Sequence, residues 1–364
     1  MISTRAALVL FSVFAVLFVV VLRTTEPSLS IPTSLRSIES DESVVISNEP
    51  VFSCEMFDQN RCAPGFVIIG VPKAGTTSLY SYLIQHPQVV GASKKELHFF
   101  RPIANPNLYN KIVRGIKDPE EQGLKLFESL SSQYVDLFPK IDGGQITGEA
   151  SPGYFYSPQV ASFLAQFKNL KVILSIRDPA DRAFSEYLNK VETGRSTTMK
   201  KKFLNLVDST PVPTFDEIAA TGLKRFQICK SRALVRKGDP CYVPPNLWQG
   251  HYDDFILPWI HAFGPERLFV LSAEKLFKDS QSTMQSVIKF LNLNPFKFDT
   301  SAAYNTATNR GADVKLEGNK QDGEIANAQR PKMSIASRSA LAIYYKGVLD
   351  SFYALLDEYH ILYL

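Results

Sequence analysis

The sequence predicts an α/β fold: an open, mostly parallel sheet flanked by helices, with a P-loop-like turn after its first strand. Short runs of β-branched and aromatic residues, typical of buried parallel strands, alternate with longer segments of helical apolar spacing. The first run, residues 66–71, enters a glycine-containing loop that leads into a helix beginning at Thr76. With 364 residues, 45% of them hydrophobic and 21% charged, the chain can bury such a core as one domain with extensions.

The N-terminus carries an apolar run, residues 6–22, bounded by Arg5 and Arg23 and interrupted only by Ser12. At 1.5 Å per residue this run spans roughly 25 Å, the short end of the range for a membrane helix. No small-x-small cleavage site follows it, so we expect residues 1–23 to be a cytosolic tip and an uncleaved signal anchor. A cleaved signal peptide is the alternative. The short head before the run leaves the large domain on the luminal side, and the short span suits an early secretory membrane.

Two further regions follow the anchor. Residues 24–60 begin with a stretch rich in Ser, Pro, Glu and Thr that lacks periodicity, so we expect a flexible stem. Residues 61–364 are expected to form the folded domain. The net charge of +4 is too small to indicate a nucleic-acid partner, but it is compatible with an anionic substrate.

The four cysteines fall in two local pairs. In an oxidising lumen we expect Cys54 to pair with Cys62 and Cys229 with Cys241, although four cysteines allow three connectivities. A zinc site would need tighter spacing and histidine partners. The cysteines therefore predict disulfides.

The remaining elements follow from the same patterns. Strands are expected at residues 66–71, 89–90, 146–150, 171–176 and 267–271. Helices are expected from Thr76, within 105–139, at 158–167, from 180, and at 216–234, 246–263, 273–291 and 334–356. The helix at 273–291 is expected to bury its apolar side chains, Phe277 among them. Loops are expected at 192–202 and 305–323.

The loop after the first strand predicts an anion site, because free N–H groups and the helix dipole point at one place. Four residues separate Gly70 from Gly75, as at the front of a Walker A loop. That motif needs a lysine directly after the second glycine, and position 76 is threonine. The only lysine is Lys73, inside the loop, which argues against ATP.

Glu96 and His98 lie two residues apart beside Phe99 and Phe100, in a segment that can present both side chains on one side. A carboxylate next to those rings would be partly desolvated, which would raise its pKa toward a useful general base. The alternative is a solvated Lys/Glu loop with His98 satisfied in the core.

Arg177 stands at the end of the strand at 171–176, and Ser185 lies two turns into the next helix. An arginine and a hydroxyl so placed can clamp a second phosphate. Alternatively, Arg177 and Asp178 form a local ion pair that caps this helix.

Five segments together resemble the sulfotransferase superfamily, and specifically the Golgi carbohydrate sulfotransferases of the heparan sulfate and chondroitin type. They occur in the family's order and cover most of residues 66–291. They are residues 71–79, 95–100, 148–154, 176–187, and 250–253 together with 268–272. Residues 331–334 and the Tyr344–Tyr345 pair are similar to the end of such a domain.

The resemblance implies 3′-phosphoadenosine 5′-phosphosulfate (PAPS) as the sulfuryl donor and adenosine 3′,5′-bisphosphate (PAP) as its product, without a metal. It implies that the 3′-phosphate binds Arg177 and Ser185, with Arg310 and Gly311 on a late lid. The 5′-phosphosulfate would bind the loop residues Lys73, Ala74, Gly75, Thr76, Thr77 and Ser78.

The resemblance also implies catalytic roles. Lys73 would neutralise the departing oxygen, Glu96 would take the acceptor's proton, and His98 would assist. The acceptor would be a polysaccharide or glycosaminoglycan, with the domain in the Golgi lumen behind a type II anchor. Enzymes of the 3-O type carry an acid where this chain has Arg101, so the sulfated position stays open.

Two other function classes would need different residues. A P-loop kinase or NTPase would need a lysine after Gly75 and an acid to hold Mg²⁺. A non-catalytic, membrane-anchored protein that binds glycans or nucleotides would not need Lys73 and Glu96. The acceptor, O- versus N-transfer and the oligomeric state are not specified by the sequence.

Overall fold

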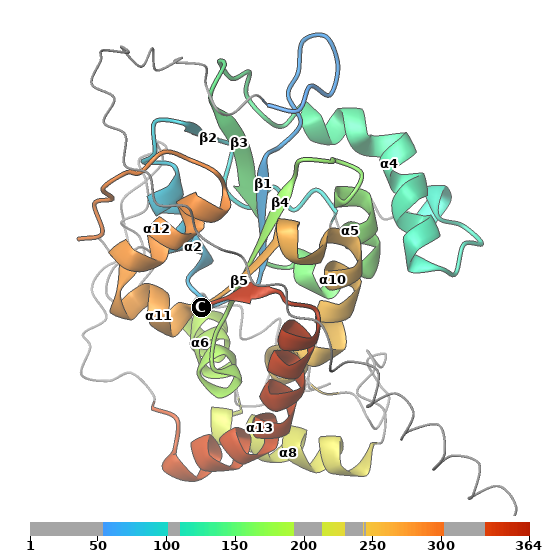
Figure 1. The fold of residues 1–364 in the computed structure, drawn as a ribbon. Helices are drawn as coiled ribbons and strands as arrows, with labels where there is room; N and C mark the ends of the chain where they lie inside the picture. The colour runs from blue at the N-terminus through green and yellow to red at the C-terminus, as the bar shows by residue number, and fades with distance from the viewer. Residues whose placement is uncertain (1–53, 101–109, 193–212, 230–242, 244, 302–331) are drawn as a thin grey trace, which may run out of the picture. The chain divides into compact units, whose positions relative to one another are not determined.

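The computed structural model describes residues 54–100, 110–192, 213–229, 243, 245–301 and 332–364 (Figure 1). These residues lie within one compact unit, Pro50–Leu364. The predicted anchor, the stem up to residue 53, Arg101, Cys241 and the predicted lid residues Arg310 and Gly311 lie outside the described residues. Among the residues described, no helix combines the length and apolarity needed to cross a membrane.

The core of the domain is a six-stranded sheet in the order β2-β3-β1-β4-β5-β6, and every neighbouring pair is parallel. From β1 the chain runs to β2 and β3 on one side, then crosses to β4, β5 and β6 on the other (Figure 1). The direction of winding therefore reverses at β1, and in open α/β sheets ligands bind beyond the carboxyl ends of strands at such a point. The strands are β1 (Phe66–Gly70), β2 (Val89–Gly91), β3 (Ile146–Ala150), β4 (Lys171–Ile176), β5 (Leu268–Ser272) and β6 (Leu362–Tyr363).

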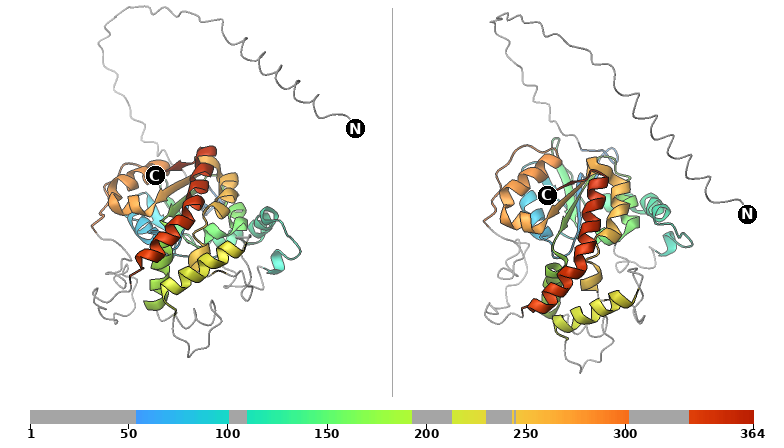
Figure 2. Two further views of the ribbon diagram at one scale, coloured as in Figure 1. Left: turned by 90° about the horizontal axis from the view of Figure 1, so that it is seen from below. Right: turned by 60° about the horizontal axis from the view of Figure 1, so that its bottom comes forward.

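Helices cover both faces of the sheet (Figures 1 and 2). Helices α5, α10 and the C-terminal half of α13 pack on one face, and α2 and α12 pack on the other. Helices α6, α8 and α13 share a third apolar cluster. The helices are α2 (Thr76–Leu83), α4 (Pro119–Val135), α5 (Pro158–Leu164), α6 (Pro179–Glu192), α8 (Phe215–Ile228), α9 (Pro245–Trp248), α10 (Asp253–Arg267), α11 (Ala273–Lys278), α12 (Ser280–Phe290) and α13 (Ile335–Glu358), with a 3₁₀ turn η1 (Tyr154–Tyr156).

Strand β1 shows why the strands read as continuous apolar runs. Val67 and Ile69 join the core on the α5–α10 face, and Phe66 and Ile68 join the core on the α2–α12 face. All four are completely buried, because a parallel sheet with helices on both faces leaves no solvated side. The predicted α/β class is therefore confirmed.

Two segments predicted as single helices are each two helices. The segment at 246–263 is divided between α9 and α10 by Gly250, where an added Cβ would lie 2.9 Å from side-chain atoms of Pro179 and Tyr345. The segment at 273–291 is divided at Asp279, whose carboxylate accepts from the Ser282 N–H at 3.0 Å and caps α12. This division turns Phe277 outward, and its exposure of 50% contradicts the prediction that it is buried.

The residues before β1 are attached to the amino edge of the sheet. Cys54 and Cys62 form the expected disulfide. Glu55, within the predicted stem, accepts from the backbone N–H groups of Lys168 at 3.1 Å and Asn169 at 2.7 Å. Cys229 is also disulfide-bonded, and its expected partner lies outside the described residues.

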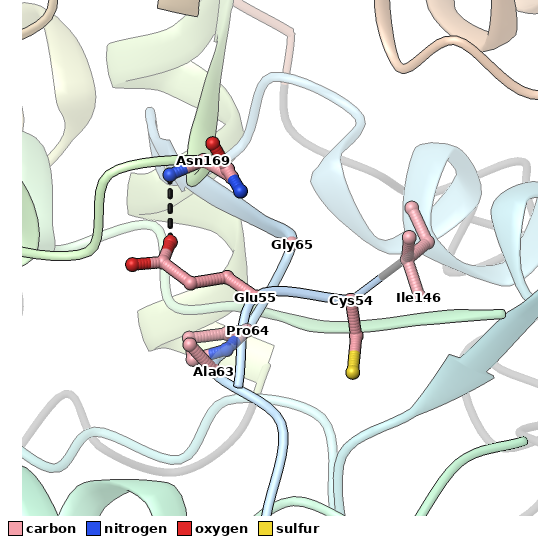
Figure 3. A pocket seen from close by; sticks show the side chains of 7 residues that line it. All are labelled: Cys54, Glu55, Ala63, Pro64, Gly65, Ile146 and Asn169. Atoms are coloured by element: carbon pink, nitrogen blue, oxygen red, sulfur yellow. Dashed lines mark hydrogen bonds between the residues drawn. The ribbon is translucent and has the colours of Figure 1, made fainter. Parts of the chain in front are cut away.

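A small pocket lies at this same amino edge (Figure 3). Gly65 directly precedes β1, and Ile146 is the first residue of β3. The pocket is therefore at the opposite end of the strands from the loop that was predicted to bind an anion. It is lined by Cys54, Glu55, Ala63, Pro64, Gly65, Ile146 and Asn169.

Candidate active site

The loop that leaves β1 adopts a conformation suited to bind an anion. Lys73 and Gly75 both have left-handed backbone angles, with φ of 72° and 74°. A side chain at Gly75 would be blocked as well as strained, because its Cβ would lie 2.8 Å from the Phe277 ring. Gly75 is the N-cap of α2 and provides no side-chain cap, and the first turn of α2 contains no acid. The N–H groups of that turn, at Thr76–Ser78, are those that a helix leaves without an intrahelical partner.

The end of β4 holds this loop in place. The Val71 N–H donates to the Ser175 carbonyl, and the Ser175 hydroxyl donates to the Ala74 carbonyl, both at 2.6 Å. The Arg177 guanidinium donates to the Lys73 carbonyl at 3.3 Å. The structure therefore brings Arg177 to the lysine loop.

Arg177 and Asp178 have different hydrogen-bond partners. The Asp178 carboxylate accepts from the Asp181 N–H at 2.9 Å in the first turn of α6. The backbone carbonyl of Arg177 accepts from the Tyr252 hydroxyl at 2.8 Å, which fixes the turn while the guanidinium faces the loop. Of the two interpretations left open, Asp178 thus acts as the helix cap and Arg177 belongs to the edge of the sheet. Ser185 is partly exposed on α6, and its predicted contact with a phosphate stays a prediction.

Glu96 and His98 lie on the other side of the loop. The Glu96 N–H donates to the carbonyl of Ala150, the last residue of β3, at 3.1 Å. The Glu96 carboxylate contacts the Lys95 ammonium at 2.6 Å and the His98 Nε2 at 3.0 Å. Both Glu96 and His98 have positive φ, of 60° and 50°, an uncommon conformation for these residue types that clusters at functional sites.

Both side chains of this pair are partly exposed. The Glu96 side chain is 39% exposed, which agrees with the partial desolvation expected for it. The alternative of a histidine satisfied in the core is wrong, because the His98 side chain is 28% exposed and bonded to Glu96. The pair is a solvent-accessible carboxylate and imidazole, a combination that can accept and shuttle a proton.

The site therefore spans three adjacent strands. Glu96 and His98 stand over the end of β3, the Lys73 loop follows β1, and Arg177 ends β4. In the part of the chain that the structure describes, no group of three or more His, Cys, Asp or Glu residues could hold a metal ion. Cations and helical N–H groups on one side and a carboxylate on the other suit the transfer of an anionic group to a nucleophile that loses a proton.

Three residues that shape this site were not assigned roles from the sequence. Lys95 contacts the Glu96 carboxylate, Tyr252 fixes the backbone of Arg177, and Glu149 lies completely buried in β3. All three fall in the segments quoted for the family resemblance. For Glu149 a further signal was available, since an acid inside a strand of a buried parallel sheet must have buried polar partners.

Comparison with known sequences gives three relationships. Residues 64–216 match the pattern described as "Sulfotransferase family". The human bifunctional heparan sulfate N-deacetylase/N-sulfotransferase 3 is 28% identical over 296 residues, which cover 78% of this chain and 28% of that protein. Mouse carbohydrate sulfotransferase 15 is 29% identical over 270 residues, which cover 65% of this chain and 45% of that protein. The chain thus spans less than half the length of these two relatives.

A solved structure extends the comparison to the fold. The crystal structure of a sulfotransferase from Alicyclobacillus acidocaldarius aligns with a TM-score of 0.52 and 23% sequence identity. The alignment covers 81% of this chain and 96% of that one, so the two share a fold.

Proposed function

We propose that this chain, whose residues 64–216 match the sulfotransferase family, transfers a sulfuryl group from PAPS to a polysaccharide. The observation that carries the proposal is the arrangement at the carboxyl edge of the sheet. Arg177 contacts the backbone of Lys73 in the anion loop, and Glu96 is bonded to the end of the neighbouring strand β3.

The donor would bind across β1 and β4. Its 5′-phosphosulfate would lie on the loop from Lys73 to Ser78, where a lysine and the N–H groups of a helix N-terminus meet. Its 3′-phosphate would bind Arg177 and Ser185. The predicted contribution of Arg310 and Gly311 remains part of this proposal. The absence of a lysine directly after Gly75 favours PAPS over ATP, as does the position of Lys73 inside the loop.

Transfer would be an in-line displacement at sulfur. The acceptor oxygen or nitrogen forms a bond to sulfur while the bond from sulfur to the bridging phosphate oxygen breaks. The Lys73 ammonium stabilises the negative charge that the electron pair brings to this oxygen, which leaves as part of PAP. Glu96 takes the acceptor's proton, and His98, hydrogen-bonded to the Glu96 carboxylate, orients it. Lys95 holds the other carboxylate oxygen.

The acceptor class is proposed from the relatives. One is named for heparan sulfate N-sulfotransfer and the other for carbohydrate sulfotransfer. A polysaccharide hydroxyl or amine, as in a glycosaminoglycan, is the acceptor that these names support.

We further propose that residues 1–23 anchor the protein in the Golgi membrane as a single-pass type II protein. The support is the apolar run at residues 6–22, followed by a region rich in Ser, Pro, Glu and Thr that suits a stem. Residues 24–60 would be that stem and residues 61–364 the luminal catalytic domain. The Cys54–Cys62 disulfide supports an oxidising compartment.

The test is to incubate the purified full chain with ³⁵S-labelled PAPS and a panel of polysaccharides, including N-desulfated and O-desulfated heparan sulfate and chondroitin. Label in a polysaccharide is the expected result, and the acceptor that takes it shows whether oxygen or nitrogen is sulfated. Binding of PAP without transfer to any acceptor would favour the non-catalytic reading. Thermal protection by Mg-ATP but not by PAP would overturn the proposal.

A further inference from the structure

The segment that carries Glu96 and His98 lies outside the helices and strands, so its backbone must find hydrogen-bond partners elsewhere. Leu97 is buried, and Leu97, His98 and Phe99 are consecutive residues directly after Glu96. The N–H groups of His98 and Phe99 have side-chain acceptors just after the end of β3. The position of the Glu96 carboxylate therefore depends on these acceptors.

One of these acceptors leads on to a buried carboxylate, that of Glu149. The His98 N–H donates to the Ser151 hydroxyl at 3.1 Å, and that hydroxyl donates to Glu149 Oε2 at 2.6 Å. The Phe99 N–H donates to the Tyr154 hydroxyl at 3.0 Å, and Tyr154 is itself buried.

This arrangement fixes the directions of the hydrogen bonds at Ser151. A hydroxyl has a single hydrogen, and Ser151 gives its own to the carboxylate. The lone pairs of the Ser151 oxygen are thereby turned toward the backbone N–H group of His98. Burial raises the pKa of Glu149, and the hydrogen bonds from Ser151 and Tyr134 oppose that rise.

An apolar residue at position 149 could not accept these hydrogen bonds. Burying a carboxylate that is 0% exposed and has no cation among these partners costs more free energy than burying an apolar side chain there. What only an acceptor with two oxygens can do is receive several donors at once and align both hydroxyls.

We propose that Glu149 is a positioning residue: through Ser151 it fixes the backbone at His98, and so holds Glu96 at the reacting acceptor. The inference rests on the proposed function in that Glu96 is the base. Glu149 itself touches neither donor nor acceptor in this account.

The variant Glu149→Gln changes the hydrogen bonding of this side chain while keeping its size. The amide has nearly the shape of the carboxylate but offers one acceptor oxygen and one NH₂ donor. The amide keeps one acceptor oxygen, so at least one of the hydroxyls of Tyr134 and Ser151 faces a donor and must turn. Ser151→Ala removes the relayed acceptor of the His98 N–H while keeping the carboxylate, and Tyr154→Phe removes the acceptor of the Phe99 N–H.

Tyr134→Phe is the matched control. The Tyr134 hydroxyl donates to Glu149 Oε1 at 2.8 Å, from a side chain as deeply buried as Glu149. Its role in this network is that one bond to the carboxylate. The control thus removes a buried hydrogen bond to Glu149 but keeps the relay to His98.

Two measurements are made on the full chain below its unfolding temperature. Hydrogen–deuterium exchange followed by mass spectrometry measures the exchange rates of the amides of residues 97–99. Steady-state kinetics measures kcat, and titration with PAP measures the affinity of the donor site. In Glu149→Gln, Ser151→Ala and Tyr154→Phe we expect these amides to exchange about tenfold faster, the equivalent of one lost hydrogen bond. We expect kcat to fall about 10- to 100-fold through misplacement of the base, with PAP affinity kept within about twofold. Tyr134→Phe should change neither reading by more than about twofold.

Exchange at residues 97–99 that is unchanged in both folded Glu149→Gln and folded Ser151→Ala would overturn the inference, as would a kcat that is unchanged in both. An equal loss of kcat in Tyr134→Phe would also overturn it, because general loosening of the core would then explain the effect. If Glu149→Gln does not fold, Ser151→Ala decides the matter alone. If the wild-type chain transfers no sulfate, the proposed function fails, while the exchange experiment still decides whether Glu149 fixes the segment.

Discussion

The two sides of β1 each bury a carboxylate, but they give it opposite surroundings. On the β4 side, Glu186 of α6 lies between Arg182 at 2.9 Å and Lys190 at 2.5 Å. Burial raises the pKa of Glu186, but these two cations outweigh burial and hold it below the ordinary value. On the β3 side, Glu149 receives the hydroxyls of Tyr134 and Ser151, and burial keeps its pKa above the ordinary value.

The difference follows from the type of backbone on each side, regular elements on the β4 side and an irregular segment on the β3 side. The β4 side consists of a strand, a tight turn and a helix, whose backbone hydrogen bonds are satisfied within the elements. There a buried ion pair, with Arg182 also donating to the Asn246 carbonyl, ties α6 to the segment before α10. The β3 side must hold an irregular segment with two positive-φ residues, so side chains supply the missing acceptors. Regular structure positions the proposed donor site, and a side-chain network positions the proposed base.

The largest expected effect comes from the lysine between the two sides. Replacing Lys73 by alanine removes the cation proposed to stabilise the departing oxygen, so the rate of transfer from PAPS should fall about 100- to 1,000-fold. The rate is measured with saturating donor. Lys125→Ala, which removes an exposed lysine of α4 paired with Glu128, should leave it unchanged. A Lys73→Ala enzyme with full activity would remove the lysine from the mechanism.

The β4 side is tested next, through donor affinity. Arg177→Ala should weaken the binding of PAP about 10- to 100-fold, because a charged hydrogen-bonding group is lost from the proposed 3′-phosphate site. Isothermal titration calorimetry with PAP measures the change. The matched control is Arg267→Ala at the opposite edge of the sheet, where the guanidinium donates to the carbonyls of Phe167, Lys168 and Ala262. If both variants lost affinity equally, Arg177 would be a structural residue.

The smallest effect is a contrast in pH dependence between the two carboxylates. Because the pKa of Glu186 is lowered, its contribution to stability is present above its ordinary pKa of 4.5 and is lost as pH falls through the lowered value. Because the pKa of Glu149 is raised, its contribution is present below 4.5 and is lost as pH rises through the raised value.

Melting temperatures across pH 3 to 8 should therefore separate the two variants. Glu186→Gln should flatten the acid limb of the profile, and Glu149→Gln should flatten the decline on the side above 4.5. Profiles for both variants that run parallel to the wild type would show that the two carboxylates do not differ in this way.

Sequence reasoning found the β4 side more completely than the β3 side. The strand at 171–176, the following helix and Arg177 at their junction were all predicted, because periodicity and order along the sheet specify them. The lysine loop was found for the same reason. The contact between Arg177 and Lys73 depends on how β1 and β4 lie beside each other, so the sequence of either strand alone could not predict it.

On the β3 side, the motif predicted Glu96 and His98 as site residues, but it did not predict which side chains contact them. The sequence placed Glu96 against aromatic rings, whereas the structure gives it Lys95 and His98 at hydrogen-bond distance. Backbone angles with positive φ and the relay from Glu149 arise from tertiary contacts between segments about 50 residues apart. Phe277 was misplaced because the cap at Asp279 starts a new helix and resets the apolar spacing.

The donor is proposed to bind at β1 and β4, and the Glu96 segment is proposed to take the acceptor's proton. The transfer rate and the PAP affinity of Glu96→Gln, measured on the same preparation, test this division directly. We expect a transfer rate about 100- to 10,000-fold below that of the wild type, as for the loss of a general base. We expect PAP affinity within about twofold of the wild type, since Glu96 is assigned no contact with the donor. Transfer at the wild-type rate, or a loss of PAP affinity as large as in Arg177→Ala, would show that Glu96 is not the base.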